Sequence, residues 1–118
     1  MVKDIILDTN FILDCIKFKI DIKSEISRVL DENFTLSIFT VTKKELHNKK
    51  NENLALQLLE KMNVNIIDTT SHNVDSAILS LDNNNIIVAT ADKKMKEKLK
   101  NRNIPILVIR EKKHLKLV

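Results

Sequence analysis

The sequence predicts an α/β domain built on a buried parallel sheet. Short apolar segments of strand length alternate along the chain with segments whose apolar residues fall at helical spacing. The predicted strands are nearly all apolar, which is typical of parallel strands covered on both faces. A length of 118 residues suits one domain, and no repeat, linker or change in composition divides it. Right-handed crossovers then place helices on both sides of the sheet.

The first half of the chain begins with a strand over 2–7 that ends at Asp8. A helix over 10–17 follows it. A second helix is indicated over 22–30, because apolar residues at i, i+4, i+7 and i+8 form one buried stripe. The next strand covers 35–39. Thr42 and Glu45 then have the spacing of a capping box, so a short helix is expected to begin at Thr42 with Glu45 in its first turn.

The second half continues the alternation as far as a basic tail. One helix is expected to open at Ser71 or His72 and to end at the asparagine run 83–85. In order, the elements are a helix over 52–62, a strand over 64–67, the helix from 71 or 72, a strand over 86–89, a helix over 92–102, a strand over 105–109 and the tail 110–118.

Composition excludes several classes of protein. A hydrophobic fraction of 43% rules out wholesale disorder, and no apolar run approaches the ~18 residues of a membrane span. Acids interrupt the first apolar stretch, which argues against a signal peptide. Cys15 is alone and lies in an apolar helix, so a buried thiol is expected, and His47, His72 and His114 lack the spacing of a zinc site. We therefore expect a cytoplasmic protein with no membrane partner.

Four acidic side chains are expected at one edge of the sheet. Asp8 directly follows the first strand, and Asp92 follows the fourth. Glu45 and Asp75 lie at the starts of the helices after the second and third strands. Because the carboxyl ends of parallel strands meet at the same edge, these carboxylates should converge there. Asp75 is next to the buried stripe of its helix and is expected to point inward.

Each acid also has a purely structural explanation. Asp8 and Asp92 could be helix N-caps. Glu45 could serve only its capping box, and Asp75 could only favour the positive end of a helix. Four converging carboxylates repel one another, however, and capping gives no reason to gather them. A divalent cation does, because Mg²⁺ and Mn²⁺ prefer oxygen ligands.

The sequence therefore predicts a site for one or two divalent metal ions, which could assist a hydrolytic reaction. Asp8 and Asp92 are the expected principal ligands, and Glu45 and Asp75 bind directly or through water. Thr9, Asn10 and Thr90 are placed to hydrogen-bond and orient these carboxylates. Asn10 could instead only cap its helix, and Thr90 could only end its strand.

Charge favours a nucleic-acid substrate. The formal net charge is +4 even with four acids assigned to the site. Lysine pairs flank Glu45 and follow Asp92, and three basic residues follow the last strand: Arg110, Lys112 and Lys113. Without Trp or Tyr to stack bases, sequence preference should be modest. The remaining lysines of the last helix are expected to form a solvated face: Lys96, Lys98 and Lys100.

The segments that hold the acids resemble PIN-domain ribonucleases, and the resemblance covers the whole chain. The first segment resembles the family's opening motif, in which an Asp ends the first strand. The last segments are similar to the archaeal branch, which includes VapC-type toxins and relatives of the small-subunit processome nuclease that cleaves pre-ribosomal RNA. The segments are ILDTNFIL at 6–13, TKKEL at 42–46, DSAIL at 75–79, VATADKK at 88–94, PILVIR at 105–110 and KKHL at 112–115.

The resemblance implies a three-layer α/β/α PIN domain over residues 1–118, with a central parallel sheet in the order 3-2-1-4-5. It also implies Mg²⁺- or Mn²⁺-dependent cleavage of single-stranded RNA, a homodimer, and an antitoxin or a ribosome-assembly factor as partner. One position departs from the pattern: Ser76 stands where the processome relatives often carry a second acid. Asp82 could replace it, but it lies about 10 Å further along the helix, so Asp75 is preferred.

Other folds with the same alternation fit less well. A phosphate-accepting receiver module needs an acidic pair after the first strand, and Asp8 stands alone. A haloacid-dehalogenase-like phosphatase needs an Asp where Asn10 stands. The remaining alternative is a PIN-like scaffold that binds RNA or protein without cutting. Loss of turnover on substitution of one acid would discriminate a nuclease from such a scaffold.

Overall fold

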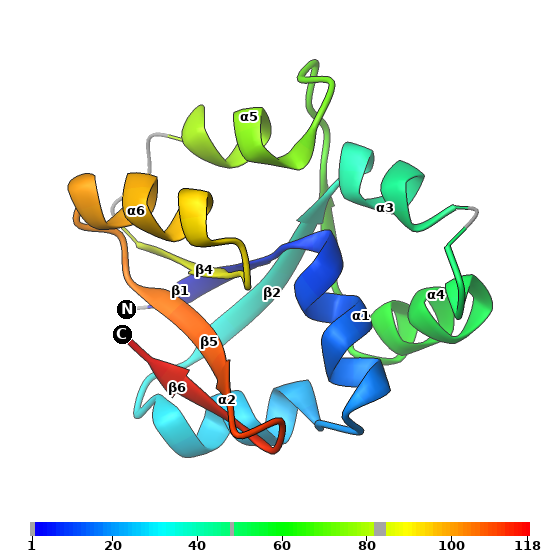
Figure 1. Ribbon diagram of the computed structural model, residues 1–118, viewed down its shortest axis with the longest axis horizontal. Coiled ribbons are helices and arrows are strands. Elements are labelled where there is room, and N and C mark those ends of the chain that lie inside the picture. The colour runs from blue at the N-terminus through cyan, green and yellow to red at the C-terminus, as the bar shows by residue number, and fades with distance from the viewer. Residues whose placement is uncertain (1, 48, 82–84) are drawn as a thin grey trace.

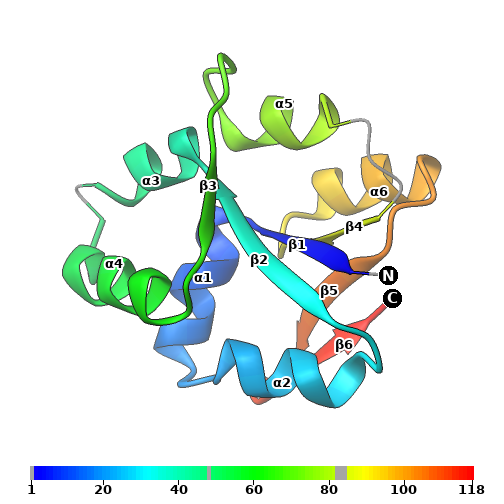
Figure 2. The same ribbon diagram turned by 180° about the vertical axis from the view of Figure 1, so that it is seen from behind.

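In the computed structural model, which describes residues 2–47, 49–81 and 85–118, six strands lie side by side in the order β3-β2-β1-β4-β5-β6 (Figures 1 and 2). Strands β1 to β5 pair in parallel, and β6 is antiparallel to β5. In chain order the strands are β1 (Lys3–Leu7), β2 (Phe34–Phe39), β3 (Asn65–Ile67), β4 (Ile86–Ala89), β5 (Ile106–Arg110) and β6 (His114–Leu117).

Helices cover both faces of this sheet, which gives three layers (Figures 1 and 2). Helices α1, α2 and α4 bury their apolar residues against one face, and α5 and α6 against the other. None of the described helices is long and apolar enough to cross a bilayer. The helices are α1 (Thr9–Lys17), α2 (Ile22–Val29), α3 (Thr40–Leu46), α4 (Glu52–Lys61), α5 (Val74–Leu79) and α6 (Lys93–Asn101).

The central strands supply side chains to two separate cores. In β1, Ile5 and Leu7 join the core under α1, α2 and α4, whereas Ile6 joins the core under α5 and α6. Strand β4 divides its residues in the same way, with Ile87 on one side and Val88 on the other. Alternation of side chains along a strand explains why continuous apolar runs are required here. The predicted α/β/α layers and the strand order 3-2-1-4-5 are confirmed.

The prediction of a tail after β5 is wrong, because residues 114–117 form a sixth strand. Leu115 is fully buried in this strand, and its backbone pairs with β5 on one side. On the other side, helix α2 contacts it: Arg28 donates to the Leu115 carbonyl at 2.8 Å, and Glu25 accepts from the Leu115 N–H at 2.9 Å. The edge of the sheet is therefore covered by α2 side chains rather than left open.

Helix α3 differs from the predicted capping box. It begins at Thr40, directly after β2, with Phe39 as N-cap and no side-chain cap. Thr42 is fully buried inside the helix, and its hydroxyl has no hydrogen-bond partner. Glu45 consequently lies in the last turn rather than the first. The chain enters the helix without a loop, so the helix starts two residues earlier than the side-chain pattern indicates.

Helix α5 is also shorter than predicted. Its N-cap is Asn73, whose side chain accepts from the Ser76 N–H at 2.8 Å, rather than Ser71 or His72. The first two residues of the asparagine run that was expected to end it, at 83 and 84, lie outside the described residues. This geometry places Asp75 in the first turn of a six-residue helix.

Candidate active site

A cavity of about 410 Å³ lies at the carboxyl edge of the sheet, beside the ends of β1 and β4. All four predicted acids line it, and they come from four different segments of the chain. We call it the acidic cavity. Its lining residues are Asp8, Thr9, Asn10, Glu45, Asn73, Val74, Asp75, Ser76, Leu79, Asp92 and Lys98.

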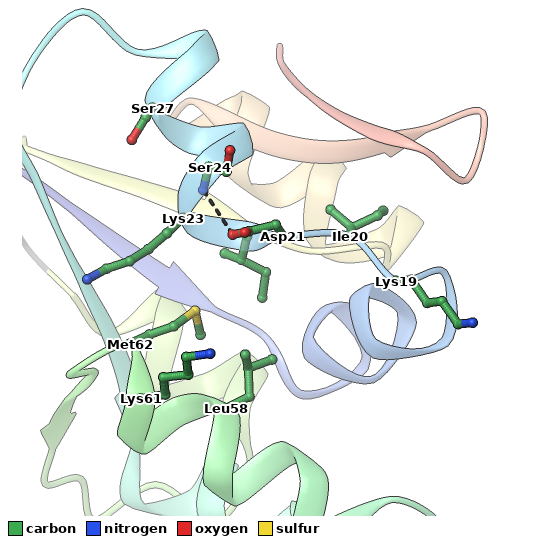
Figure 3. Close-up of a pocket in the computed structure, with 10 residues that line it drawn as sticks. Lys19, Ile20, Asp21, Lys23, Ser24, Ser27, Leu58, Lys61 and Met62 are labelled. Carbon is green, nitrogen blue, oxygen red and sulfur yellow. Dashed lines mark hydrogen bonds between the residues drawn. The ribbon is translucent and has the colours of Figure 1, made fainter.

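A larger hollow, of about 630 Å³, lies elsewhere, between α2 and the end of α4 (Figure 3). Lys19, Lys23 and Lys61 line it, and we call it the lysine-lined hollow. Its one acid is Asp21, which accepts from the Ser24 N–H at 3.1 Å and so caps α2. The acids therefore converge in the smaller of the two cavities, and size alone does not locate the candidate site.

Asp8 is the most buried of the four acids, with 8% of its surface exposed. One carboxylate oxygen, Oδ1, accepts from the Thr9 N–H at 2.9 Å, and Oδ2 accepts from the Thr90 hydroxyl at 2.8 Å. Burial raises the pKa of this carboxyl, and the nearby charges of Asp75 and Glu45 raise it further, whereas the two hydrogen bonds lower it. Asp8 is also the N-cap of α1. It therefore both caps a helix and belongs to the group of converging acids.

Glu45 is connected to Asp8 through Thr9. The Thr9 hydroxyl donates to Oε1 of Glu45 at 2.7 Å, while the Thr9 N–H donates to Asp8. Thr9 is buried, so its contact with Asp8 is shielded from solvent and its contact with Glu45 is partly shielded. One residue therefore fixes the orientation of the Asp8 carboxylate, directly after β1, and of the Glu45 carboxylate on α3.

Asp92 is connected to Asp8 through Thr90 in a similar way. The Thr90 hydroxyl donates to Asp8 and accepts from the Asp92 N–H at 3.1 Å. Asp92 caps α6, since its Oδ1 accepts from the N–H groups of Lys94 at 2.9 Å and Met95 at 3.3 Å. Both capping hydrogen bonds use the same carboxylate oxygen, Oδ1. The Asp92 side chain is exposed and lines the acidic cavity.

Asp75 lies on α5 and lines the acidic cavity together with Asp92. Partial burial and the charges of Asp92 and Glu45 raise the pKa of its carboxyl, and the charge of Lys98 opposes this. The expectation that Asp75 points away from solvent is wrong in part, because the residue is exposed although it lines the cavity. The alternative acid, Asp82, lies outside the described residues.

Five further residues line the acidic cavity that the sequence did not assign to it, namely the apolar Val74 and Leu79 and the polar Asn73, Ser76 and Lys98. Lys98 was expected on a solvated face with its neighbours. Its position depends on how α6 packs beside α5 (Figure 1), which the sequence pattern of α6 alone does not contain. Asn10 is exposed and lines the cavity as well.

Comparison with known proteins agrees with this arrangement. A family model described as a PIN like domain matches residues 5–112. This chain belongs to the PIN-domain family. A curated relative, Ribonuclease VapC4 from Methanocaldococcus jannaschii, is 40% identical, and the match covers 96% of this chain and 95% of that protein. The structure of the PIN domain endonuclease Utp24 is similar in fold, with a TM-score of 0.85, 24% identity, and coverage of 97% of this chain and 90% of the other.

The acidic cavity of this PIN domain has a donor set that suits a hard divalent cation. In residues 2–47, 49–81 and 85–118, no group of three or more His, Cys, Asp or Glu side chains is arranged so that it could hold a metal ion. A Mg²⁺ site, however, commonly takes one or two carboxylates and completes its coordination with water and substrate phosphate. The four donors are all carboxylates, and burial together with repulsion from the other acids raises the pKa of Asp8 and Asp75. These residues therefore fit Mg²⁺ or Mn²⁺ and give no sulfur or imidazole ligand for a softer metal.

Proposed function

We propose that this PIN domain is a divalent-metal-dependent endoribonuclease that hydrolyses phosphodiester bonds of single-stranded RNA. The convergence of Asp8, Glu45, Asp75 and Asp92 on one cavity at the carboxyl edge of the sheet carries the proposal. A divalent cation held there would supply Lewis-acid activation of water and neutralise charge on the phosphate. Mg²⁺ and Mn²⁺ are the expected ions.

The residues around the cavity hold the acids ready for that chemistry. Asp8 is fixed by hydrogen bonds to both of its oxygens, and each oxygen retains a further lone pair for a ligand. Thr9 orients Glu45, and Thr90 positions the turn that carries Asp92. Such fixed orientation reduces the reorganisation that the reaction requires. We assign Asp8 and Asp92 as principal ligands, Glu45 and Asp75 as direct or water-mediated ligands, and Thr9, Asn10 and Thr90 as residues that orient them.

Charge supports RNA as the substrate. The chain carries 20 basic against 16 acidic residues, although four acids are gathered at the site. Exposed lysines lie beside two of the acids in the sequence: Lys43 and Lys44 precede Glu45 on α3, and Lys93 and Lys94 follow Asp92 at the start of α6. A polyanion is attracted by this distribution irrespective of its sequence. The VapC4 relative, described as a ribonuclease, supports the same class of substrate.

We infer a toxin-type role, with an antitoxin as protein partner, because the relative at 40% identity is a VapC ribonuclease. The second candidate role is maturation of ribosomal RNA, which rests on the resemblance of the sequence segments to relatives of the small-subunit processome nuclease. A homodimer, action in the cytoplasm and assignment of the whole chain, 1–118, to one domain remain predictions from the sequence.

The deciding experiment is cleavage of a labelled single-stranded RNA in Mn²⁺ or Mg²⁺ by the wild type and by Asp8→Asn. EDTA is added in a third reaction. Cleavage by the wild type that is lost in the other two reactions is the expected result. The variant must retain the circular-dichroism spectrum and the elution volume of the wild type, so that lost cleavage is not lost folding.

A folded wild type that binds this RNA without cutting it, in either metal, would favour a non-catalytic PIN-like scaffold instead. Cleavage retained in EDTA would contradict the metal-dependent chemistry. Cleavage retained in Asp8→Asn would contradict the assignment of the acidic cavity.

A further inference from the structure

Lys98 is the one basic residue among those described as lining the acidic cavity. It lies on α6, six positions after Asp92, and its side chain is exposed. The ion pairs recorded within the described residues join Arg28 to Glu25 and His47 to Glu52, so the Lys98 ammonium group is in none of them. A cation without a fixed partner therefore stands on the wall of a cavity that contains four carboxylates.

The neighbouring side chain on the same face of α6 has a different task. Arg102 follows Lys98 by four positions, which places both on one side of the helix. The Arg102 guanidinium donates to the carbonyl oxygen of Leu79, at the end of α5. This contact, together with the shared apolar core of Ala77, Ile78 and Leu99, joins the two helices. Lys98 is thus not needed to tie α6 to α5.

The charge of the cavity indicates what Lys98 is for. An RNA phosphate that enters meets carboxylates from four segments, and their repulsion opposes its approach. An ammonium group is a compact point charge on a flexible stem, and it commonly binds phosphate. We propose that Lys98 binds a phosphate group of the RNA strand inside the acidic cavity and positions that strand for cleavage. This inference rests on the proposed function.

The test uses the full chain and four lysine variants. Lys98→Met removes the charge and keeps most of the side-chain volume, and Lys98→Arg keeps the charge. Lys100→Met is the matched control, because Lys100 is an exposed lysine on the same helix that does not line the cavity. Lys61→Met, from the lysine-lined hollow, controls for general attraction of RNA to a basic protein.

Two quantities are measured. The first is kcat/KM for single-stranded RNA, and Lys98→Met is expected to lower it by about tenfold to a hundredfold, chiefly through KM. The second is the Kd of the same RNA for the uncleaving Asp8→Asn protein with and without Lys98→Met. The added substitution should weaken binding and reduce the slope of log Kd against log salt by about 0.7. Lys98→Arg should recover most of the loss, and the two controls should change either quantity by less than about twofold.

Equal effects of Lys98→Met and Lys100→Met would overturn the inference, as would a loss that Lys98→Arg does not recover and that accompanies a lower Tm. The latter result would make Lys98 a structural counter-ion of Asp75. Failure of the proposed function is distinguishable, since the wild type would then leave RNA uncut. Lys98-dependent binding without cleavage would support the phosphate contact on a scaffold that is not a nuclease.

Discussion

The hydroxyl group of Thr90, at the end of β4, donates a 2.8 Å hydrogen bond to Oδ2 of Asp8, at the end of β1. The same hydroxyl oxygen accepts from the Asp92 N–H at 3.1 Å. Thr90 is fully buried, so its hydrogen bond to the Asp8 carboxylate is made out of contact with solvent and its hydrogen bond to the Asp92 backbone is partly shielded. The relative position of Asp8 and Asp92 therefore depends on one side chain that does not line the cavity itself.

Thr90→Val should separate that function from simple packing. Valine fills the same space without a hydroxyl group, so Asp8 and the Asp92 N–H each lose a buried partner. We expect the free energy of unfolding to fall by about 1–3 kcal/mol and RNA cleavage to fall by about 10- to 100-fold. Urea unfolding and initial rates measure the two effects. Thr90→Ser keeps both hydrogen bonds and is the control; cleavage by Thr90→Val at the rate of Thr90→Ser would contradict the prediction.

Asp92 has two roles that a pair of substitutions can separate. Asparagine is as good an N-cap as aspartate, so Asp92→Asn should unfold at the same urea concentration as the wild type or a higher one when metal is absent, since it also removes a like charge near Asp75. Asp92→Ala loses the cap and should be less stable by about 1 kcal/mol. Both variants should lose cleavage alike. If Asp92→Asn cleaves RNA normally, Asp92 is a cap alone.

Thr42→Val tests how α3 begins. The Thr42 hydroxyl is buried within the helix without a hydrogen-bond partner, which is unfavourable. Replacing it with a methyl group of similar size should leave the free energy of unfolding unchanged or raise it by up to about 1 kcal/mol. A true N-cap would behave oppositely, with a loss of about 1 kcal/mol. Thermal unfolding of the two proteins distinguishes the two positions of the helix start.

The stability of the metal-free protein should depend on pH through Asp75. Its pKa is raised above the ordinary value of 3.8, so the unfolded chain releases this proton at a lower pH than the folded chain does. Stability from this group is therefore present at low pH and is lost as the pH rises through the folded pKa. Asp75→Asn removes the group.

The variant should accordingly gain stability relative to the wild type between about pH 3.5 and about pH 7, as measured by urea unfolding in EDTA. Asp31→Asn, an exposed acid that does not line the acidic cavity, is the control. An equal difference between Asp75→Asn and the wild type at both pH values would show that Asp75 is not perturbed by its neighbours.

The fold could be predicted well from the sequence because local patterns of apolar residues specify its strands and helices. Apolar runs such as that of β4 and helical stripes such as that of α2 each require burial on a defined side, and their order leaves few topologies. The ends of elements were predicted less well. Strand β6 escaped detection because its buried Leu115 is surrounded by basic residues, and its pairing with β5 and α2 is a tertiary contact.

The same distinction applies to the site. Asp8 and Asp92 could be located from sequence, since both closely follow apolar strands whose places in the sheet follow from the topology. Lys98 could not, because nothing in the sequence of α6 distinguishes it from Lys96 or Lys100. Its position is set by the packing of α6 beside α5, in which Arg102 reaches the carbonyl of Leu79.

Helix α5 carries Asp75 on six residues, fewer than any other described helix has. Three of its side chains, Val74, Ala77 and Ile78, are buried against the sheet, and so short a helix has little stability of its own. Local opening of α5 therefore costs less free energy than global unfolding. The four acids need not be lost together on warming: amide hydrogens of α5 should exchange before those of β1 and β4, and Asp75 should leave the cavity while Asp8 remains in place.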